Sequence, residues 1–308
     1  LDKVLLNTSK VAEALWVLAV HETETAVGGG IIWLASYPKS GNTWLRIFLE
    51  NLFRNTQSPA DINDLSVVKF SDNSFALYET VSGRPLRNES DSNIHKLRNP
   101  VQKYMGSRSE TVFAKTHNAV MNFENSPLIW LEHLAGVIYV IRNPLDMLVS
   151  FSDHYNLTID DTIEAISSPY HRINSTEKGI FQILGGWSNH YYSWFNVENL
   201  SPFCLRYEDM IQNPVKSFGK LMKFLRLPKD TPRLKRAIRH SSFQVVSQQE
   251  TKKGFAEQSR AGHKFFRQGK VGSYRRVLSD DQIAKVIDNH GELMVEMGYL
   301  DKNGILKV

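Results

Sequence analysis

The sequence predicts an α/β fold with a central, mainly parallel sheet flanked by helices. Three apolar runs rich in β-branched residues support this prediction, at residues 31–35, 111–115 and 136–141. Continuous apolar runs of this length are typical of strands that are covered on both faces. Segments with a helical spacing of apolar residues follow the first and the third run. The chain of 308 residues is long enough for one large domain, which we expect to span residues 31–308.

The residues around the first run predict a strand, a tight loop and a helix. Residues 31–35 form the strand, Pro38 and Gly41 interrupt it, and Leu45 begins a segment with helical spacing. A loop in this position exposes backbone N–H groups at a helix N-terminus, where the helix dipole favours an anion. Lys39 adds a positive charge to the same loop. The stretch therefore predicts a site for phosphate or sulfate.

The composition is that of an ordinary soluble globular protein, with 42% hydrophobic and 22% charged residues. The net charge of +5 suits an anionic ligand, but it is equally typical of a slightly basic protein without one. Cys204 is the only cysteine, which excludes an intrachain disulfide and favours a reducing compartment. The apolar run at residues 14–20 is shorter than the ~20 residues that span a bilayer and lacks the flanks of a signal peptide. We therefore expect a cytoplasmic protein without a membrane span.

Three stretches lie outside the regular pattern. Residues 1–30 predict an N-terminal helix followed by a glycine hinge, and the sequence leaves open whether this helix is native to the protein. Residues 59–106 and 156–178 are polar with little periodicity. Long stretches of this kind inside a compact domain are usually functional or mobile. We expect both to be irregular insertions on the substrate side, the first as a lid or pocket wall.

The second and third strands are followed by residues that are candidates for catalysis or anion binding. The strand at 111–115 runs into His117, and the strand at 136–141 runs into Arg142. A lone histidine is more often structural than catalytic, but the ends of strands are where α/β sheets place their chemistry. An imidazole with a pKa near ~6.5 can take a proton from a hydroxyl and return it to solvent. Pro144 suits the first turn of the following helix, which places Ser150 about two turns into it.

The remaining chain predicts further helices and one strand. Residues 181–195 predict an amphipathic helix whose aromatic stripe is more typical of a core than of a ligand site. Residues 202–206 predict a strand that ends at Tyr207. Helices are predicted at residues 214–227, 232–240 and 279–297, the last with Ser279 as its N-cap.

The order of residues in the first loop is unusual for a phosphate-binding loop. In the pattern GxxxxGK[ST] the lysine follows the second glycine, whereas Lys39 precedes Gly41 by two residues. Residues 38–44 instead resemble the 5′-phosphosulfate loop of cytosolic-type sulfotransferases, P-K-[ST]-G-[TN]-T-W in outline. These enzymes use the sulfate donor PAPS, 3′-phosphoadenosine 5′-phosphosulfate. Further segments resemble the same family in the same order, namely K-T-H at 115–117, R-N-P-x-D-x-x-x-S at 142–150, Y-E-D at 207–209, S-S-F at 241–243 and the glycine-containing segment at 265–274.

The resemblance implies a P-loop-like three-layer sandwich and a defined set of site residues. His117 would be the catalytic base, with Lys39 and Lys115 supporting the reaction centre. Trp44 and Phe243 would hold the adenine from two sides, and Arg142 would bind the 3′-phosphate. The residues expected to contact the donor are Lys39, Ser40, Gly41, Asn42, Thr43, Trp44, Arg142, Ser150, Tyr207, Ser241, Phe243, Phe266, Arg267, Gln268 and Gly269. PAP, the desulfated nucleotide, would be the product, and no metal would be needed.

The sequence departs from the family pattern near its end. Gln268 stands where the family usually has lysine, and Ser273 and Tyr274 replace the usual Asp-Trp. The short dimer motif that often follows is not recognisable, so a homodimer is compatible with the sequence but not indicated by it. We expect a small-molecule acceptor with a hydroxyl or amine and no nucleic-acid partner. The acceptor itself is not readable from the sequence.

Two alternative functions remain at this point. A P-loop-type small-molecule kinase shares the strand, loop and helix, but it would have lysine directly after the loop glycine and an acidic ligand for magnesium. A catalytically silent nucleotide-binding module would keep the donor site and lose turnover. The presence of both Lys39 and His117 argues against the second alternative.

Overall fold

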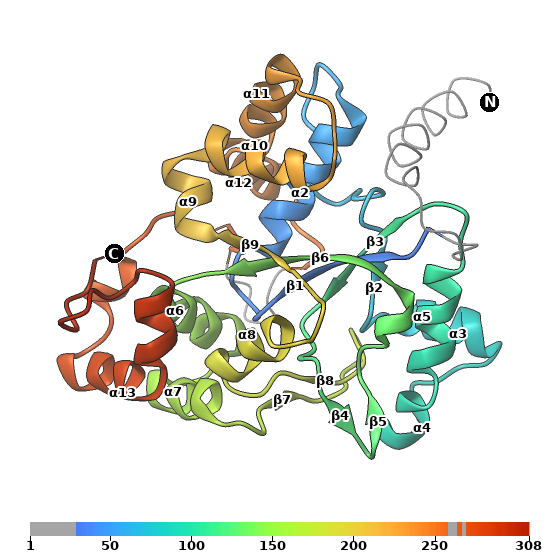
Figure 1. Ribbon diagram of the computed structural model, residues 1–308, viewed down its shortest axis with the longest axis horizontal. Helices are drawn as coiled ribbons and strands as arrows, with labels where there is room; N and C mark the ends of the chain where they lie inside the picture. The colour runs from blue at the N-terminus through green and yellow to red at the C-terminus, as the bar shows by residue number, and fades with distance from the viewer. Residues whose placement is uncertain (1–28, 258–263, 267–268, 308) are drawn as a thin grey trace.

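A computed structural model of the chain describes residues 29–257, 264–266 and 269–307. Its centre is a five-stranded sheet in the order β2-β3-β1-β6-β9, with parallel pairing between all neighbours (Figure 1). The strands are β1 (Ile31–Ser36), β2 (Phe70–Ser71), β3 (Val112–Thr116), β6 (Leu134–Ile141) and β9 (Phe203–Arg206). The predicted α/β class is confirmed. The helix predicted for residues 1–30 falls on residues 1–28, which lie outside the described residues.

The sheet is the middle of three layers because both of its faces are apolar. Along β1, Trp33 packs into the core on one face and Leu34 into the core on the other. Helices α2 (Asn42–Arg54), α10 (Pro214–Phe224) and α11 (Thr231–His240) cover the face of Leu34. Helices α5 (Arg98–Gly106), α6 (Pro144–Tyr155) and α8 (Trp187–Phe195) cover the face of Trp33 (Figure 1). The aromatic stripe of α8 lies in this core, as predicted.

Helices α6 and α13 (Asp280–Glu296) begin where the sequence signals predict. Pro144 occupies the first turn of α6, and the Asn143 side chain accepts a hydrogen bond from the Leu145 N–H at 3.0 Å. Helix α13 begins with a capping box between Ser279 and Gln282. Ser279 is therefore the N-cap that the sequence predicts.

The expectation of irregular structure at residues 59–106 and 156–178 was wrong. The first stretch contains α3 (Phe75–Ser82), α4 (Asp91–His95), α5 and the edge strand β2, and the second contains α7 (Ile159–Ser167). The short helices α3, α4 and α7 begin at Ser74, Ser90 and Thr158, whose side chains cap them. Helices of two turns show little periodicity and gain their stability from tertiary packing, so the pattern did not indicate them.

The helix predicted from residue 181 begins six residues later, at Trp187. Before it, β8 (Gln182–Ile183) pairs antiparallel with β7 (Arg172–Ile173), and Gly185 and Gly186 lie between β8 and the helix. The other elements are β4 (Asn122–Phe123), β5 (Ser126–Pro127), α9 (Tyr207–Gln212), α12 (Phe243–Lys253) and 3-10 helices at Leu131–His133 and Ser273–Arg276. Among the described residues, no helix is both long and apolar enough to cross a membrane.

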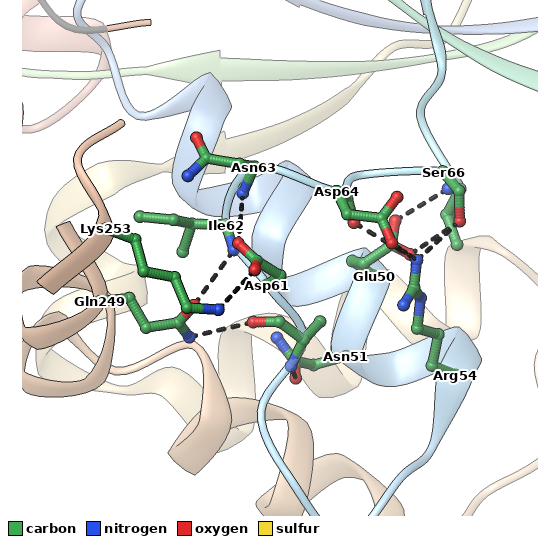
Figure 2. Close-up of polar contacts among 12 residues, drawn as sticks. Glu50, Asn51, Arg54, Asp61, Ile62, Asn63, Asp64, Ser66, Gln249 and Lys253 are labelled. Carbon is green, nitrogen blue, oxygen red and sulfur yellow. Dashed lines mark hydrogen bonds and ion pairs between the residues drawn. The ribbon is translucent and has the colours of Figure 1, made fainter. Parts of the chain in front are cut away.

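The segment between α2 and β2 connects α2 to α12 through polar contacts (Figure 2). Asp61 forms an ion pair with Lys253 of α12 at 2.6 Å. Gln249 of α12 accepts a hydrogen bond from the Ile62 N–H at 3.2 Å, and Arg54 of α2 bridges Glu50 and Asp64. These contacts hold the C-terminal end of α12 beside α2, the helix that begins at the predicted anion site.

Candidate active site

The predicted site residues follow strands that end at the same edge of the sheet. Ala35 of β1 is in register with Thr116 of β3, and Ile141 of β6 is in register with Arg206 of β9. The loop after β1, His117 after β3, Arg142 after β6 and Tyr207 after β9 therefore meet at the carboxyl edge. A cavity of about 950 Å³ opens there.

Most predicted residues line this cavity. They are Lys39, Gly41, Asn42, Thr43, Trp44, Lys115, His117, Arg142, Ser150, Tyr207, Phe243, Phe266 and Gly269. Ser40 and Ser241 do not line it, and both are buried. Arg267 and Gln268 lie outside the described residues, so their roles stay predictions.

The loop after β1 has a backbone conformation that requires glycine at position 41. Gly41 has φ of 109°, and a Cβ there would lie 2.6 Å from the ring of Tyr207, so a side chain would fit neither the backbone nor the space. Asn42 begins α2, and its side chain donates a hydrogen bond to the Leu34 carbonyl oxygen at 2.8 Å. The Ser40 hydroxyl is buried and has no partner among the described residues. The N-terminus of α2 is thereby fixed toward the cavity.

Lys39 lies in a partly apolar environment that disfavours its charge. Its Nζ is 3.5 Å from Nδ1 of His154 and 3.8 Å from the ring centroid of Phe265. Burial, and next the neighbouring Arg142, lower the pKa of Lys39 from 10.5 to about 7. Burial also lowers the pKa of Lys115. A cavity with several buried cationic groups is well suited to a highly charged anion.

Arg142 contacts both the loop and the end of β9. Its guanidinium carbon lies 4.4 Å from the ring centroid of Tyr207, and its Nη1 donates to the Lys39 carbonyl oxygen at 3.3 Å. Ser150 lines the same cavity from α6. The structure thus brings Tyr207 together with Arg142 and Ser150, which the sequence places in a different segment.

Asp146 of α6 anchors the C-terminal segment in which the sequence departs from the family pattern. Its carboxylate accepts hydrogen bonds from the Gly272 N–H at 2.6 Å, the Ser273 hydroxyl at 2.8 Å and the Tyr274 N–H at 3.0 Å. Tyr274 is buried. Ser273 and Tyr274 therefore hold this segment against α6.

Trp44 and Phe243 both line the cavity, and the adenine clamp stays a prediction. The indole of Trp44 donates to the Ser241 carbonyl oxygen at 2.7 Å. A Cβ on Gly269 would overlap the ring of Phe243, so the glycine backbone lies directly against that ring. The Ser241 hydroxyl donates to the Ala237 carbonyl oxygen of the preceding helix at 2.9 Å. The predicted contact of this hydroxyl with adenine stays a prediction.

The orientation of His117 leaves one ring nitrogen available to the cavity. Its Nδ1 lies 2.7 Å from the carbonyl oxygen of Ser36, and because a carbonyl only accepts, Nδ1 carries the proton. Burial, and next the charge of Lys115, hold the pKa of His117 well below 6.5, so the ring is neutral. Its Nε2 therefore presents a lone pair. His190 Nε2 lies 3.0 Å from the His117 carbonyl oxygen and fixes the backbone at this position.

Sequence reasoning missed two charged residues at the loop. The Glu257 carboxylate accepts a hydrogen bond from the Thr43 hydroxyl at 3.1 Å and one from Arg46 Nη1 at 2.5 Å. Burial alone would raise the pKa of Glu257, but Arg46 and then Lys115 lower it to about 2. Arg46 follows Thr43 by three residues on α2, a spacing that indicates a shared face. Glu257 is separated from Thr43 by 214 residues, and no local pattern connects them.

The part of the chain that the structure describes contains no group of three or more His, Cys, Asp or Glu side chains placed to hold a metal ion. The positive charges that line this cavity are those of lysine and arginine side chains, and carboxylates, among them Asp146 and Glu257, line it as well.

The fold is that of known sulfotransferases. A crystal structure of mouse sulfotransferase SULT7A1 complexed with PAP aligns with 94% of this chain and 89% of its own, with a TM-score of 0.57 and 20% identity. A crystal structure of retinol dehydratase in complex with androsterone and inactive cofactor PAP aligns with 86% of this chain and 80% of its own, with a TM-score of 0.59 and 18% identity.

Sequence comparison gives the family. The sulfotransferase domain family matches residues 31–298. Sulfotransferase 1B1 of Canis lupus familiaris is 27% identical over 69% of this chain and 64% of its own length, a little under two thirds. Flavonol 3-sulfotransferase of Flaveria bidentis is 25% identical over 83% of this chain and 78% of its own. The chain belongs to the sulfotransferase domain family. This membership favours a sulfotransferase over the kinase alternative.

Proposed function

We propose that the protein transfers a sulfuryl group from PAPS to a hydroxyl or amine of a small-molecule acceptor, with His117 as the general base. The observation that carries this proposal is the common cavity of His117, the Lys39 loop and Arg142, which arrive from three different strands. In this cavity the proposed proton acceptor, His117, lies beside an anion-binding site that is lined by positive charges. Transfer of a charged group to a hydroxyl requires this combination.

The donor end of the cavity fits a phosphosulfate group. Thr43 and Arg46 both donate hydrogen bonds to the carboxylate of Glu257, which indicates that they can bind an anion. Lys39, Thr43 and the N-terminus of α2 would hold the 5′-phosphate, and Arg142 with Ser150 would hold the 3′-phosphate. Arg267, outside the described residues, is expected to join Arg142. Trp44 and Phe243 would hold the adenine through its π-face.

When bound, PAPS supplies a sulfuryl group whose bond to the 5′-phosphate oxygen breaks as a bond from sulfur to the acceptor oxygen or nitrogen forms. The Nε2 of His117 would take the proton that the acceptor loses. Lys39 and Lys115 would stabilise the charge that develops on the phosphate side. The hydrogen bond from Nδ1 to Ser36 keeps Nε2 directed toward the acceptor and stabilises the imidazolium that forms.

The acceptor side of the cavity supports a small organic acceptor that carries a polar group. Phe75, Tyr155 and Ile180 contribute apolar surface, and Asn73 and Gln182 contribute amides. One structural neighbour was determined with androsterone and another with retinol, both hydrophobic molecules. A cytoplasmic location, a single domain over residues 31–308 and the lack of a nucleic-acid partner stay predictions.

The test is transfer of label from sulfur-labelled PAPS to a panel of phenols, alcohols and amines. The wild-type protein should label at least one acceptor, and His117→Ala should retain PAP binding but lose most of the transfer. Wild-type rates in His117→Ala would remove His117 from the role of base. PAP binding by the wild type without transfer to any acceptor would favour the silent module.

A further inference from the structure

We propose that Glu257 is an internal competitor for the donor site, a carboxylate that occupies the anion position at Thr43 until the donor phosphate displaces it. The inference rests on the proposed function, because it assigns the 5′-phosphate of PAPS to the same Thr43. It concerns how tightly the site holds its nucleotide and how fast it releases it.

The contacts of Glu257 are those expected of a bound anion. One carboxylate oxygen accepts from the Thr43 hydroxyl at 3.1 Å and the other accepts from Arg46 Nη1 at 2.5 Å. Thr43 lies in the first turn of α2, where the helix dipole also favours negative charge. Thr43 cannot hold the carboxylate and a phosphate oxygen in this geometry at once. Donor binding therefore requires Glu257 to give up this hydrogen bond.

The position of Glu257 is determined by the fold, because the residues before it are tied to the segment after α2. Asn63 accepts a hydrogen bond from the Ala256 N–H at 2.8 Å and donates to the Gly254 carbonyl oxygen at 3.2 Å. Asp61, two residues away, pairs with Lys253 at the end of α12 (Figure 2). Both contacts come from the same segment that is joined to α2. They hold the backbone that leads into Glu257 close to the start of α2.

The side chain of Glu257 can also turn away from Thr43 toward solvent. Its side chain is 34% exposed, whereas that of Arg46 is 12% exposed. An exposed edge allows the carboxylate to turn toward solvent while Arg46 stays in the wall of the cavity and becomes available to the arriving phosphate. Without the donor, the carboxylate offsets the positive charge of Arg46 and Lys115. With the donor, the phosphate takes over this role, and exchange in the reverse direction assists release of PAP.

The proposal predicts that removing the charge of Glu257 strengthens nucleotide binding. PAP affinity of Glu257→Gln should increase about tenfold over wild type, the equivalent of one charge-assisted hydrogen bond. The dissociation rate of PAP, followed by stopped-flow, should fall by a similar factor. Asn63→Ala, which loosens the segment before Glu257, should change affinity in the same direction by less. Isothermal titration calorimetry with PAP measures these affinities, and thermal unfolding verifies that each variant is folded.

The control is Asp64→Asn, which removes the same charge from an exposed carboxylate on the same segment. It should leave PAP affinity at the wild-type value. Equal strengthening in Asp64→Asn and Glu257→Gln would show a general charge effect and overturn the proposal. Unchanged or weaker binding in Glu257→Gln, confirmed in Glu257→Ala, would assign Glu257 to the support of Arg46 and Thr43 instead. If the wild type binds no PAP, the proposed function itself fails. This outcome is distinct from failure of the competitor role, in which the wild type binds PAP but Glu257→Gln does not bind it more tightly.

Discussion

The Nδ1 atom of His117 lies 2.7 Å from the carbonyl oxygen of Ser36, the last residue of β1. This hydrogen bond joins the end of β3 to the strand that leads into the anion-binding loop. It fixes the tautomer of the imidazole and connects the position of His117 to the position of the loop. In the proposed reaction, the sheet itself would align His117 with the donor.

The first prediction separates the two ring nitrogens of His117. His117→Asn keeps a side-chain N–H near the position of Nδ1, able to donate to Ser36, and removes the lone pair of Nε2. We expect kcat to fall by about 10²–10⁴-fold, the usual contribution of a general base, with little change in PAP affinity. Label-transfer kinetics and calorimetry measure the two quantities. A parallel loss of PAP affinity and kcat would mean that His117 shapes the donor site and is not mainly a base.

The second prediction concerns protons taken up on nucleotide binding. The pKa of Lys39 is about 7 without the nucleotide, and a bound phosphate should raise it, so binding above pH 7 should protonate Lys39. PAP affinity should therefore fall as the pH rises from 7 to 9, a range in which phosphates with a second pKa of about 6 do not titrate. Calorimetry in buffers of different ionisation enthalpy measures the proton uptake.

Lys39→Met is the control for this uptake. It should remove most of the proton uptake and flatten the pH dependence, leaving only what Lys115 contributes. Proton uptake of wild-type size in Lys39→Met would place the titrating group elsewhere.

The third prediction tests the 3′-phosphate site at Arg142. Arg142→Ala should weaken PAP binding roughly 10- to 100-fold through the loss of charge-assisted hydrogen bonds. The same variant should bind adenosine 5′-monophosphate, which lacks the 3′-phosphate, nearly as well as the wild type. Arg142→Lys should give an intermediate loss for PAP, because it keeps the charge but loses the planar contact with Tyr207. Equal losses for both nucleotides would reject the assignment.

The fourth prediction tests the adenine clamp at Phe243. Gly269 has φ of 57°, and a Cβ there would overlap the Phe243 ring, so Gly269→Ala should displace this ring and weaken PAP binding. Gly304→Ala is a matched control, because Gly304 has φ of 78° with open space around it. Both variants should lose about 1 kcal/mol of folding stability through backbone strain, but only Gly269→Ala should lose affinity. Unchanged PAP affinity in a folded Gly269→Ala protein would contradict a role of Phe243 in holding the base.

The sequence predicted the central sheet well because buried parallel strands are continuous apolar runs. The strands that end at His117 and Arg142 were recognised for this reason, and their ends located most of the cavity. The short helices α3, α4 and α7 were missed because each depends on a serine or threonine cap and on packing more than on periodicity.

Contacts between distant segments were beyond sequence reasoning. Glu257 reaches Thr43 across 214 residues, and Lys39 meets His154 and Phe265 only in the folded chain. Such contacts depend on how α6, α12 and the loop are packed together. The spacing of residues along a single segment carries no information about them.

The most direct test of the account is a crystal structure of the protein with PAP. We predict the 5′-phosphate within hydrogen-bond distance of Thr43 and the backbone at the start of α2, the 3′-phosphate at Arg142, and Nε2 of His117 facing the space beyond the 5′-phosphate. A nucleotide bound in another cleft, or bound here with Arg142 and His117 both distant from it, would contradict the account.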